Sequence, residues 1–209
     1  MRLAEIEVVD SPLVKDAIDL AQTYSQPSLF NHVMRSWLFG VLATEKASAK
    51  VNHELMAVAA VLHDLGLTEK FAAAERFEVD GANAARTFLV GHGIEPREVQ
   101  VVWDAIALHT TFSIAMHKEP EVAFCCSGIT IDVIGYGLDQ IPAQQTEAIL
   151  AAYPRLAIKE HLKNALCGVV RSKPQTTYDN FVRDFGERYV EGYQAPSAAD
   201  RIQNAPFAE

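Results

Sequence analysis

Apolar residues recur at helical spacing along most of the chain, and runs of strict apolar–polar alternation, which would indicate strands, are missing. Leu29, Val33, Trp37 and Val41 follow one another at intervals of four and form one stripe of a helix expected over 29–50. Residues 55–62 are apolar at every position, which is typical of a helix in the middle of a core. The pattern therefore predicts an all-α fold.

Capping residues, prolines and glycines predict where the helices begin and end. Ser11-Pro12 opens a helix that runs to 24, and Asn52 caps the apolar helix, which we expect to end near Gly66. Further helices are expected over 80–90, 96–109, 119–139, 143–152, 156–172 and 176–192. We expect one compact domain over 1–209, with helices 143–192 packed on a core at 30–137 and a loose or partner-docked tail at 195–209.

Composition narrows the class of protein. The chain has 209 residues, 49% hydrophobic and 22% charged, which suits one well-packed domain. A net charge of -9 without a basic cluster argues against nucleic-acid binding, since neutralising phosphates needs a basic face. No apolar run approaches the ~18 residues of a membrane span, and no C-x-x-C pair is present. We do not expect the first residues to be a signal peptide, because they carry acids and lack a long apolar core. We expect a cytoplasmic protein with a small-molecule substrate and no nucleic-acid or membrane partner, and a homodimer stays open.

The sharpest chemical feature is His63-Asp64 at the end of the apolar helix. A buried carboxylate needs an ion pair or a metal, because burying it alone is very unfavourable. Asp64 acting as a local cap beside a core histidine is the alternative. His32 and Asp132 lie on two other apolar helices, and Asp132 could instead bond to a backbone group or an arginine. Together the four residues form a nitrogen and oxygen ligand set suited to Zn²⁺, Fe²⁺ or Mn²⁺.

The order His32, His63-Asp64, Asp132 resembles the signature of the HD superfamily, whose members are helical metal-dependent phosphohydrolases and their relatives. Four segments, at 31–36, 62–66, 76–82 and 106–110, are more specifically similar to its cyanamide hydratase-like branch. The resemblance implies that these four residues bind one divalent metal, zinc first, with Fe²⁺ or Mn²⁺ as alternatives. It also implies an enzyme, a hydrolase or hydro-lyase, in which a metal-activated hydroxide adds to the C≡N bond of a small compound such as cyanamide and gives urea.

The same resemblance suggests roles for four further residues. Glu78 would be a catalytic proton shuttle or orienting group, although a solvated glutamate near a helix N-terminus is an equal alternative. His109 would contact the substrate or support the metal, or else only neutralise a helix C-terminus. Arg35 and Asn31 would bind substrate, with Arg35 alternatively holding the carboxylate of a metal ligand.

Departures from the wider superfamily keep other functions open. Phe77 stands where some HD proteins carry a histidine for a second metal, which argues for a single ion. An HD phosphohydrolase acting on nucleotides or other phosphomonoesters is the runner-up, weakened by the missing lysine after the HD pair. Asp132-Val133 replaces the Asp-Asn that is frequent in the cyanamide branch and leaves the substrate open. A non-catalytic helical metal-binding protein is the third hypothesis.

Overall fold

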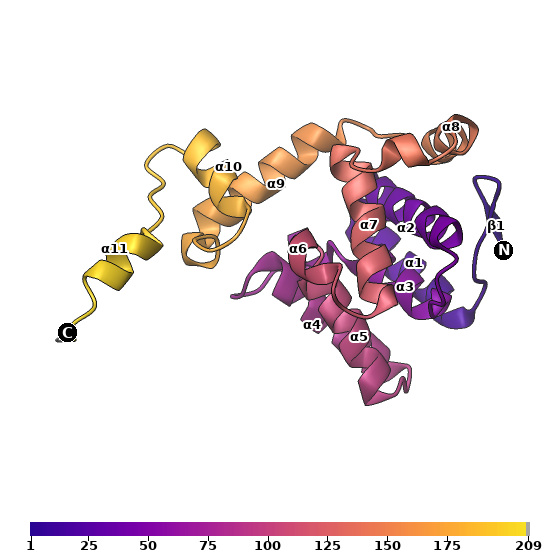
Figure 1. Ribbon diagram of the computed structural model, residues 1–209, viewed down its shortest axis with the longest axis horizontal. Coiled ribbons are helices and arrows are strands. Elements are labelled where there is room, and N and C mark those ends of the chain that lie inside the picture. Colours follow the sequence, from indigo (N-terminus) through magenta and orange to yellow (C-terminus); the bar gives the residue numbers. More distant parts are fainter. Residues whose placement is uncertain (208–209) are drawn as a thin grey trace. The chain divides into compact units, whose positions relative to one another are not determined.

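The computed structural model describes residues 1–207 and confirms the all-α fold (Figure 1). The elements in chain order are β1 (Arg2–Leu3), β2 (Ile6–Glu7), α1 (Pro12–Tyr24), α2 (Pro27–Ala47), α3 (His53–Leu62), η1 (Leu65–Leu67), α4 (Phe77–Gly91), α5 (Pro96–Ala107), α6 (Phe112–Ala115), α7 (Pro120–Ile134), η2 (Leu138–Gln140), α8 (Ala143–Ala152), α9 (Ile158–Ser172), η3 (Pro174–Thr176), α10 (Val182–Tyr189) and α11 (Ala198–Gln203), where η denotes a 3₁₀ helix. The two short strands form an antiparallel hairpin that pairs Arg2 with Glu7 and Leu3 with Ile6.

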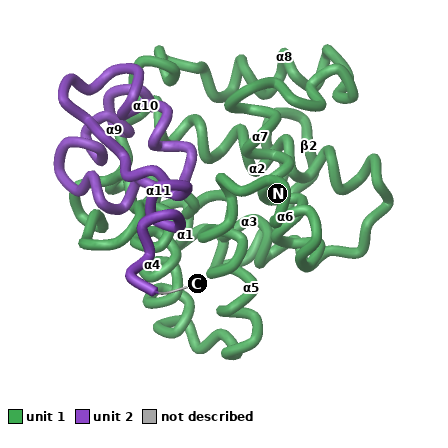
Figure 2. The backbone as a smooth tube through the Cα atoms, turned by 60° about the vertical axis from the view of Figure 1, so that its left-hand side comes forward, with its two compact units in different colours: residues 1–161 green, residues 162–209 purple. Residues whose placement is uncertain are grey.

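The chain divides into two compact units, residues 1–161 and 162–209, shown in green and purple in Figure 2. The boundary falls within α9. All of the residues predicted to form the site belong to the first unit. That the whole chain forms one domain, with the C-terminal helices packed on the core, stays a prediction.

Helix α3 is the centre of the first unit. Every residue from Leu55 to Leu62 is buried, as the uninterrupted apolar run predicts. The helix contacts α1, α2, α5 and α7, so its C-terminal end is surrounded by other helices. The predicted cap is confirmed, because the Asn52 side chain accepts hydrogen bonds from the backbone N–H groups of Glu54 and Leu55. This packing brings His63 and Asp64, which directly follow α3, into the interior.

Two glycines allow α2 and α7 to approach closely. A Cβ atom on Gly128 would collide with the carbonyl oxygen of Ser36 and lie 2.8 Å from the Cα of Gly40. A Cβ on Gly40 would in turn lie 3.0 Å from the carbonyl oxygen of Phe124. Because the two backbones meet here, the next turn of α7 carries Asp132 to the face of α2 that holds His32.

We expect Gly128→Ala to destabilise the fold by about 2–3 kcal/mol, since the methyl group can fit only if the two helices move apart. Guanidinium unfolding followed by circular dichroism measures this change. Gly91→Ala is the matched control, because nothing lies within 4 Å of the Cβ position at this last residue of α4. Equal stabilities of the two variants would contradict the proposed close contact.

Several helix boundaries differ from the sequence predictions. Helix α3 ends at Leu62 rather than near Gly66, since the chain turns through His63-Asp64 into η1. Helix α4 begins at Phe77 rather than at 80. Asp80 does not cap it; its carboxylate instead accepts hydrogen bonds from the backbone N–H groups of Ala73 and Glu75 and holds the preceding loop.

Differences also occur further along the chain. Helix α7 stops at Ile134 instead of 139, because Gly135 adopts a left-handed conformation with φ +75°. The region 176–192 contains the shorter helix α10, and the tail is not wholly irregular, since Ser197 caps α11. Residues 208–209 of the predicted tail lie outside the described residues. Within residues 1–207, no helix combines the length and apolar character that crossing a membrane requires.

Candidate metal centre

Three buried side chains direct ligand atoms at one point. The Nε2 atoms of His32 and His63 are 3.2 Å apart, and they lie 3.5 Å and 3.3 Å from Oδ2 of Asp64. Zinc bonds of about 2.0–2.1 Å at tetrahedral angles separate ligand atoms by about 3.3 Å. The three atoms therefore form one triangular face of a coordination tetrahedron and could hold a metal ion.

The second nitrogen of each histidine fixes the orientation of its ring. Nδ1 of His63 donates a hydrogen bond to the carbonyl oxygen of Ala60 at 2.7 Å. Nδ1 of His32 lies 2.6 Å from Oδ2 of Asp132 and donates to this carboxylate. Both arrangements leave Nε2 facing the centre, which is how metal-binding histidines are usually held.

Asp132 is bound to side chains around it. Besides His32, it accepts hydrogen bonds from Arg35, with Nε 2.6 Å from Oδ1 and Nη2 2.8 Å from Oδ2. Burial by itself would raise the pKa of Asp132, but the bonds from His32 and Arg35 outweigh it and lower the pKa to about 2. The structure thus brings Asp132 to the outer nitrogen of His32, outside the triangle of ligand atoms. Direct metal binding by Asp132 stays a prediction.

Arg35 is fully buried, and its other contacts tie α2 to the loop after α8. Its Nη1 donates to the carbonyl oxygens of Tyr153 and Pro154 at 3.1 Å and 3.2 Å. Asn31, one turn earlier on α2, donates from Nδ2 to the same Pro154 oxygen at 2.8 Å. Of the two roles considered for Arg35, it holds the carboxylate of Asp132, whereas substrate binding by Arg35 and Asn31 stays a prediction.

The charges of the triangle attract one another. Burial would lower the pKa of His63, but the adjacent Asp64 carboxylate and the bond to Ala60 outweigh it and raise the pKa. Burial would likewise raise the pKa of Asp64, but His63, His32 and His109 hold it well below its usual range. Asp64 is therefore an anion near neutral pH and available to a cation. The alternative in which it caps the chain locally is wrong, since its side chain caps nothing in η1.

His109 lies beside the triangle, just after the end of α5, and its predicted role stays a prediction. Its Nε2 is 3.7 Å from Oδ1 of Asp64, and its ring meets that of His63 edge to face at 4.8 Å. Nδ1 donates to the carbonyl oxygen of Ile106 at 2.6 Å. Burial, together with the charge of His63, lowers the pKa of His109 to about 4. His109 is thus neutral at pH 7, with the Nε2 lone pair on the side of Asp64.

Glu78 is almost fully buried, so a solvated glutamate is excluded. Its Oε1 accepts hydrogen bonds from Thr110 at 2.8 Å and Arg76 at 2.9 Å, whereas Oε2 is buried without a hydrogen-bond partner. Its charge raises the pKa of His109, which places the two groups within electrostatic reach. An unpaired buried carboxylate oxygen is costly and typical of a functional group.

A second glycine contact explains how Glu78 reaches this region. A Cβ on Gly66 would collide with the carbonyl oxygen of Phe77 and lie 2.8 Å from the backbone nitrogen of Gly81. Only glycine therefore lets η1 lie directly against the first turns of α4. This contact brings the start of α4, and Glu78 with it, to the segment that follows Asp64.

Two contacts were not predicted from the sequence. Thr110 donates to Glu78, and its place in the Ile-Ala-Leu-His-Thr segment beside His109 was the available signal. Arg155 donates from Nη1 to the backbone oxygen and Oδ1 of Asp132, at 3.0 Å and 3.2 Å. No local pattern marks Arg155, because it lies in a loop 23 residues after its partner.

No protein-family model and no curated protein matches the chain. The chemistry of the site therefore has to follow from its own residues.

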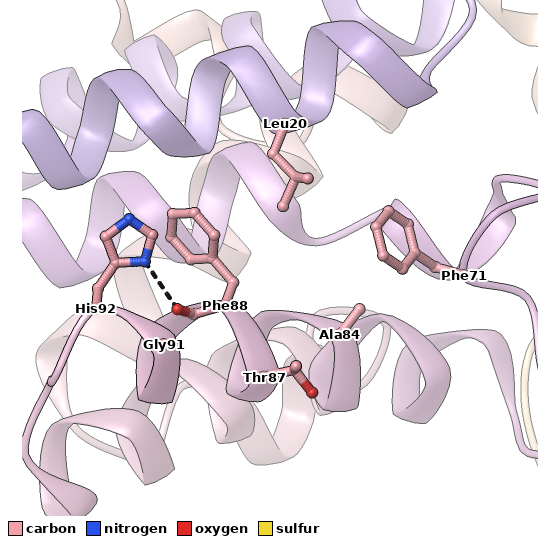
Figure 3. A pocket seen from close by; sticks show the side chains of 7 residues that line it. All are labelled: Leu20, Phe71, Ala84, Thr87, Phe88, Gly91 and His92. Carbon is pink, nitrogen blue, oxygen red and sulfur yellow. Dashed lines mark hydrogen bonds between the residues drawn. The ribbon is translucent and has the colours of Figure 1, made fainter.

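A separate apolar pocket of about 550 Å³ lies between α1 and α4, and none of the predicted site residues lines it (Figure 3). Its lining consists of Leu20, Phe71, Ala84, Thr87, Phe88, Gly91 and His92.

Proposed function

We propose that the protein is a metal-dependent hydrolytic enzyme of the HD type that hydrates a small C≡N compound such as cyanamide to urea. The observation that carries the proposal is the buried triangle of His32, His63 and Asp64 with His109 beside it. A site built only for structure would surround an ion with four protein ligands, whereas catalysis needs an open position. A set of three leaves such a position for water or substrate.

The donor atoms fit a borderline divalent ion such as zinc, since two imidazole nitrogens and one carboxylate oxygen are a common catalytic set. A bound metal ion would lower the pKa of a coordinated water and polarise the substrate nitrogen. Asp132 and Arg35 would fix the ring of His32, and Ala60 that of His63, so that both nitrogens face the ion.

The remaining groups would move protons. Addition of water to cyanamide breaks one O–H bond of water and one π bond of C≡N, and forms one C–O and one N–H bond. The step is redox-neutral, and the product tautomerises to urea. Nε2 of His109, which lies 3.7 Å from Oδ1 of Asp64, would accept the proton from water. Glu78, with Oε2 unpaired, would hold the amino group of the substrate or relay the proton to its nitrogen.

The charges at the site favour a small neutral substrate over a phosphomonoester. Arg35 is paired with Asp132 and Arg76 with Glu78, so both guanidinium groups already bind carboxylates. A dianionic phosphate usually requires arginine or lysine groups that can turn toward it. Asp64 and Glu78 would also repel a dianion.

Elemental analysis of the purified protein, combined with urea release from cyanamide, tests the proposal. We expect about one zinc or iron per chain and urea formation that a chelator abolishes and added metal restores. One metal per chain without urea would overturn the proposed substrate, and absence of metal would overturn the proposed enzyme class. Phosphate release from nucleoside monophosphates would favour the phosphohydrolase instead.

Glu78→Gln is expected to lower kcat for urea release by about 10²-fold or more while the metal content stays unchanged, since only proton transfer is impaired. Steady-state kinetics and elemental analysis on the same sample measure both effects. Glu69→Gln is the matched control, because Glu69 is exposed in the segment that follows η1. Loss of metal in Glu78→Gln would instead assign Glu78 to the metal ligands.

A further inference from the structure

A second pocket borders the candidate metal centre, because Asp132 belongs to its lining. Its volume is about 300 Å³, at the lower end of the range for small-molecule sites. It is formed by the middle of α2, the C-terminal end of α7, η2, helix α8 and the chain from Arg155 to Lys159. Its apolar wall includes Phe39, Leu138 and Leu150.

Two cationic side chains, Arg155 and Lys159, line the same pocket. Arg155 uses Nη1 to hold Asp132, while its side chain remains 35% exposed. The Lys159 ammonium has no ion-pair or hydrogen-bond partner in residues 1–207. Asp132 is the one acidic residue of the lining, and its carboxylate is already satisfied by His32 and Arg35. The pocket is therefore locally positive in a chain of net charge -9.

The backbone between the two cations is unusual. Leu156 and Ala157 have φ values of +46° and +58°, in the left-handed region that residues with a side chain rarely adopt. Two consecutive residues of this kind cost free energy, and such conformations gather at binding and active sites. The turn they form sets Arg155 and Lys159 on the lining of the same pocket.

The geometry points to a binding site for a small organic anion in this pocket, with a carboxylate or phosphate on Arg155 and Lys159 and an apolar body against Phe39, Leu138 and Leu150. A charged group adjoining an apolar wall selects for both parts of such a ligand, since neither an inorganic ion nor a neutral apolar molecule satisfies both. The inference does not require the proposed reaction, because none of His32, His63 and Asp64 lines the pocket, and Asp132 alone is shared with the candidate metal centre.

Titrations of the intact protein, followed by two-dimensional amide NMR, test this site with hexanoate, the uncharged hexanamide, and acetate as probes. We expect hexanoate to produce saturable shifts at Leu138, Thr146 and Leu150, and the other two probes to bind at least about tenfold more weakly. Hexyl phosphate separates the two anion classes, since tighter binding than hexanoate would assign a phosphate and weaker binding a carboxylate.

Two variants test the two halves of the site. Lys159→Gln should weaken hexanoate binding about three- to fivefold, because the ion pair forms at an exposed lysine. Leu138→Ser should weaken it similarly, and Lys50→Gln, an exposed lysine that does not line the pocket, should leave it unchanged. The site would be overturned by absence of saturable hexanoate shifts, by equal binding of hexanamide, or by unchanged affinity in Lys159→Gln.

Discussion

His63→Ala is expected to abolish tight metal binding and, with it, catalysis. His63 supplies one of three atoms in the triangle, and its Nε2 lies 3.2 Å and 3.3 Å from the other two. Loss of a group that merely orients a metal ligand typically weakens metal affinity about 10–100-fold, so loss of the ligand itself should exceed about 100-fold. Elemental analysis after dialysis, with competition against a zinc chelator, measures the change.

Removing a buried imidazole also leaves a cavity, so a fold measurement has to accompany the metal analysis. His63→Gln fills most of the space without restoring the geometry of the ring and should lose metal as well. His53→Ala is the matched control, because His53 is exposed at the first turn of the same helix. A folded His63→Gln protein that still holds one zinc per chain would show that the metal lies elsewhere.

Asp132→Ala is expected to destabilise the metal-free protein by about 3–5 kcal/mol. The substitution leaves the fully buried guanidinium of Arg35 without its carboxylate, and an unpaired buried charge is far more costly than a missing pair. Guanidinium unfolding in the presence of a chelator measures the effect. Asp139→Ala, at an exposed residue shortly after α7, is the control and should change stability by less than about 0.5 kcal/mol.

A double variant tests whether the stability lost in Asp132→Ala comes from the unpaired charge of Arg35 or from the cavity that the substitution leaves. Arg35→Met with Asp132→Leu removes both charges, so we expect it to recover much of the stability lost in Asp132→Ala. The double variant should nevertheless bind metal about 10–100-fold more weakly than the native chain, because His32 loses the partner of its Nδ1. If the double variant were as unstable as the single one, the charge argument would be wrong.

Low pH should reproduce part of the loss of stability expected for Asp132→Ala, because it protonates the same carboxylate. The pKa of Asp132 is about 2 in the folded chain, below the ordinary value of 3.8 for an aspartate side chain, so the unfolded chain binds the proton more readily. Its contribution, about 2 kcal/mol, is therefore complete above pH 4 to 5 and is lost as the pH falls toward 2. Unfolding free energies of the metal-free protein measured from pH 5 to pH 2 should fall less steeply in Asp132→Asn.

The fold class and most helices could be predicted from the sequence because they depend on local patterns. Pro12 and Asn52 mark helix starts, and the apolar run at 55–62 belongs in a core whatever surrounds it. The sequence also allowed candidate metal ligands to be recognised, namely His32, His63 and Asp64, for a related reason. A histidine or carboxylate on an otherwise apolar helix needs a partner wherever the helix packs.

Which partner each residue has was decided only by the tertiary structure. Asp132 contacts Arg35, His32 and Arg155, and these contacts exist because two glycines let α7 lie against α2 and because the chain returns past α2 after α8. Periodicity gives the buried face of a helix but not the element packed on it. The sequence alone thus indicated which side chains need a metal or a counter-charge, whereas the crossing of α2 and α7 decided that Asp132 meets the outer nitrogen of His32.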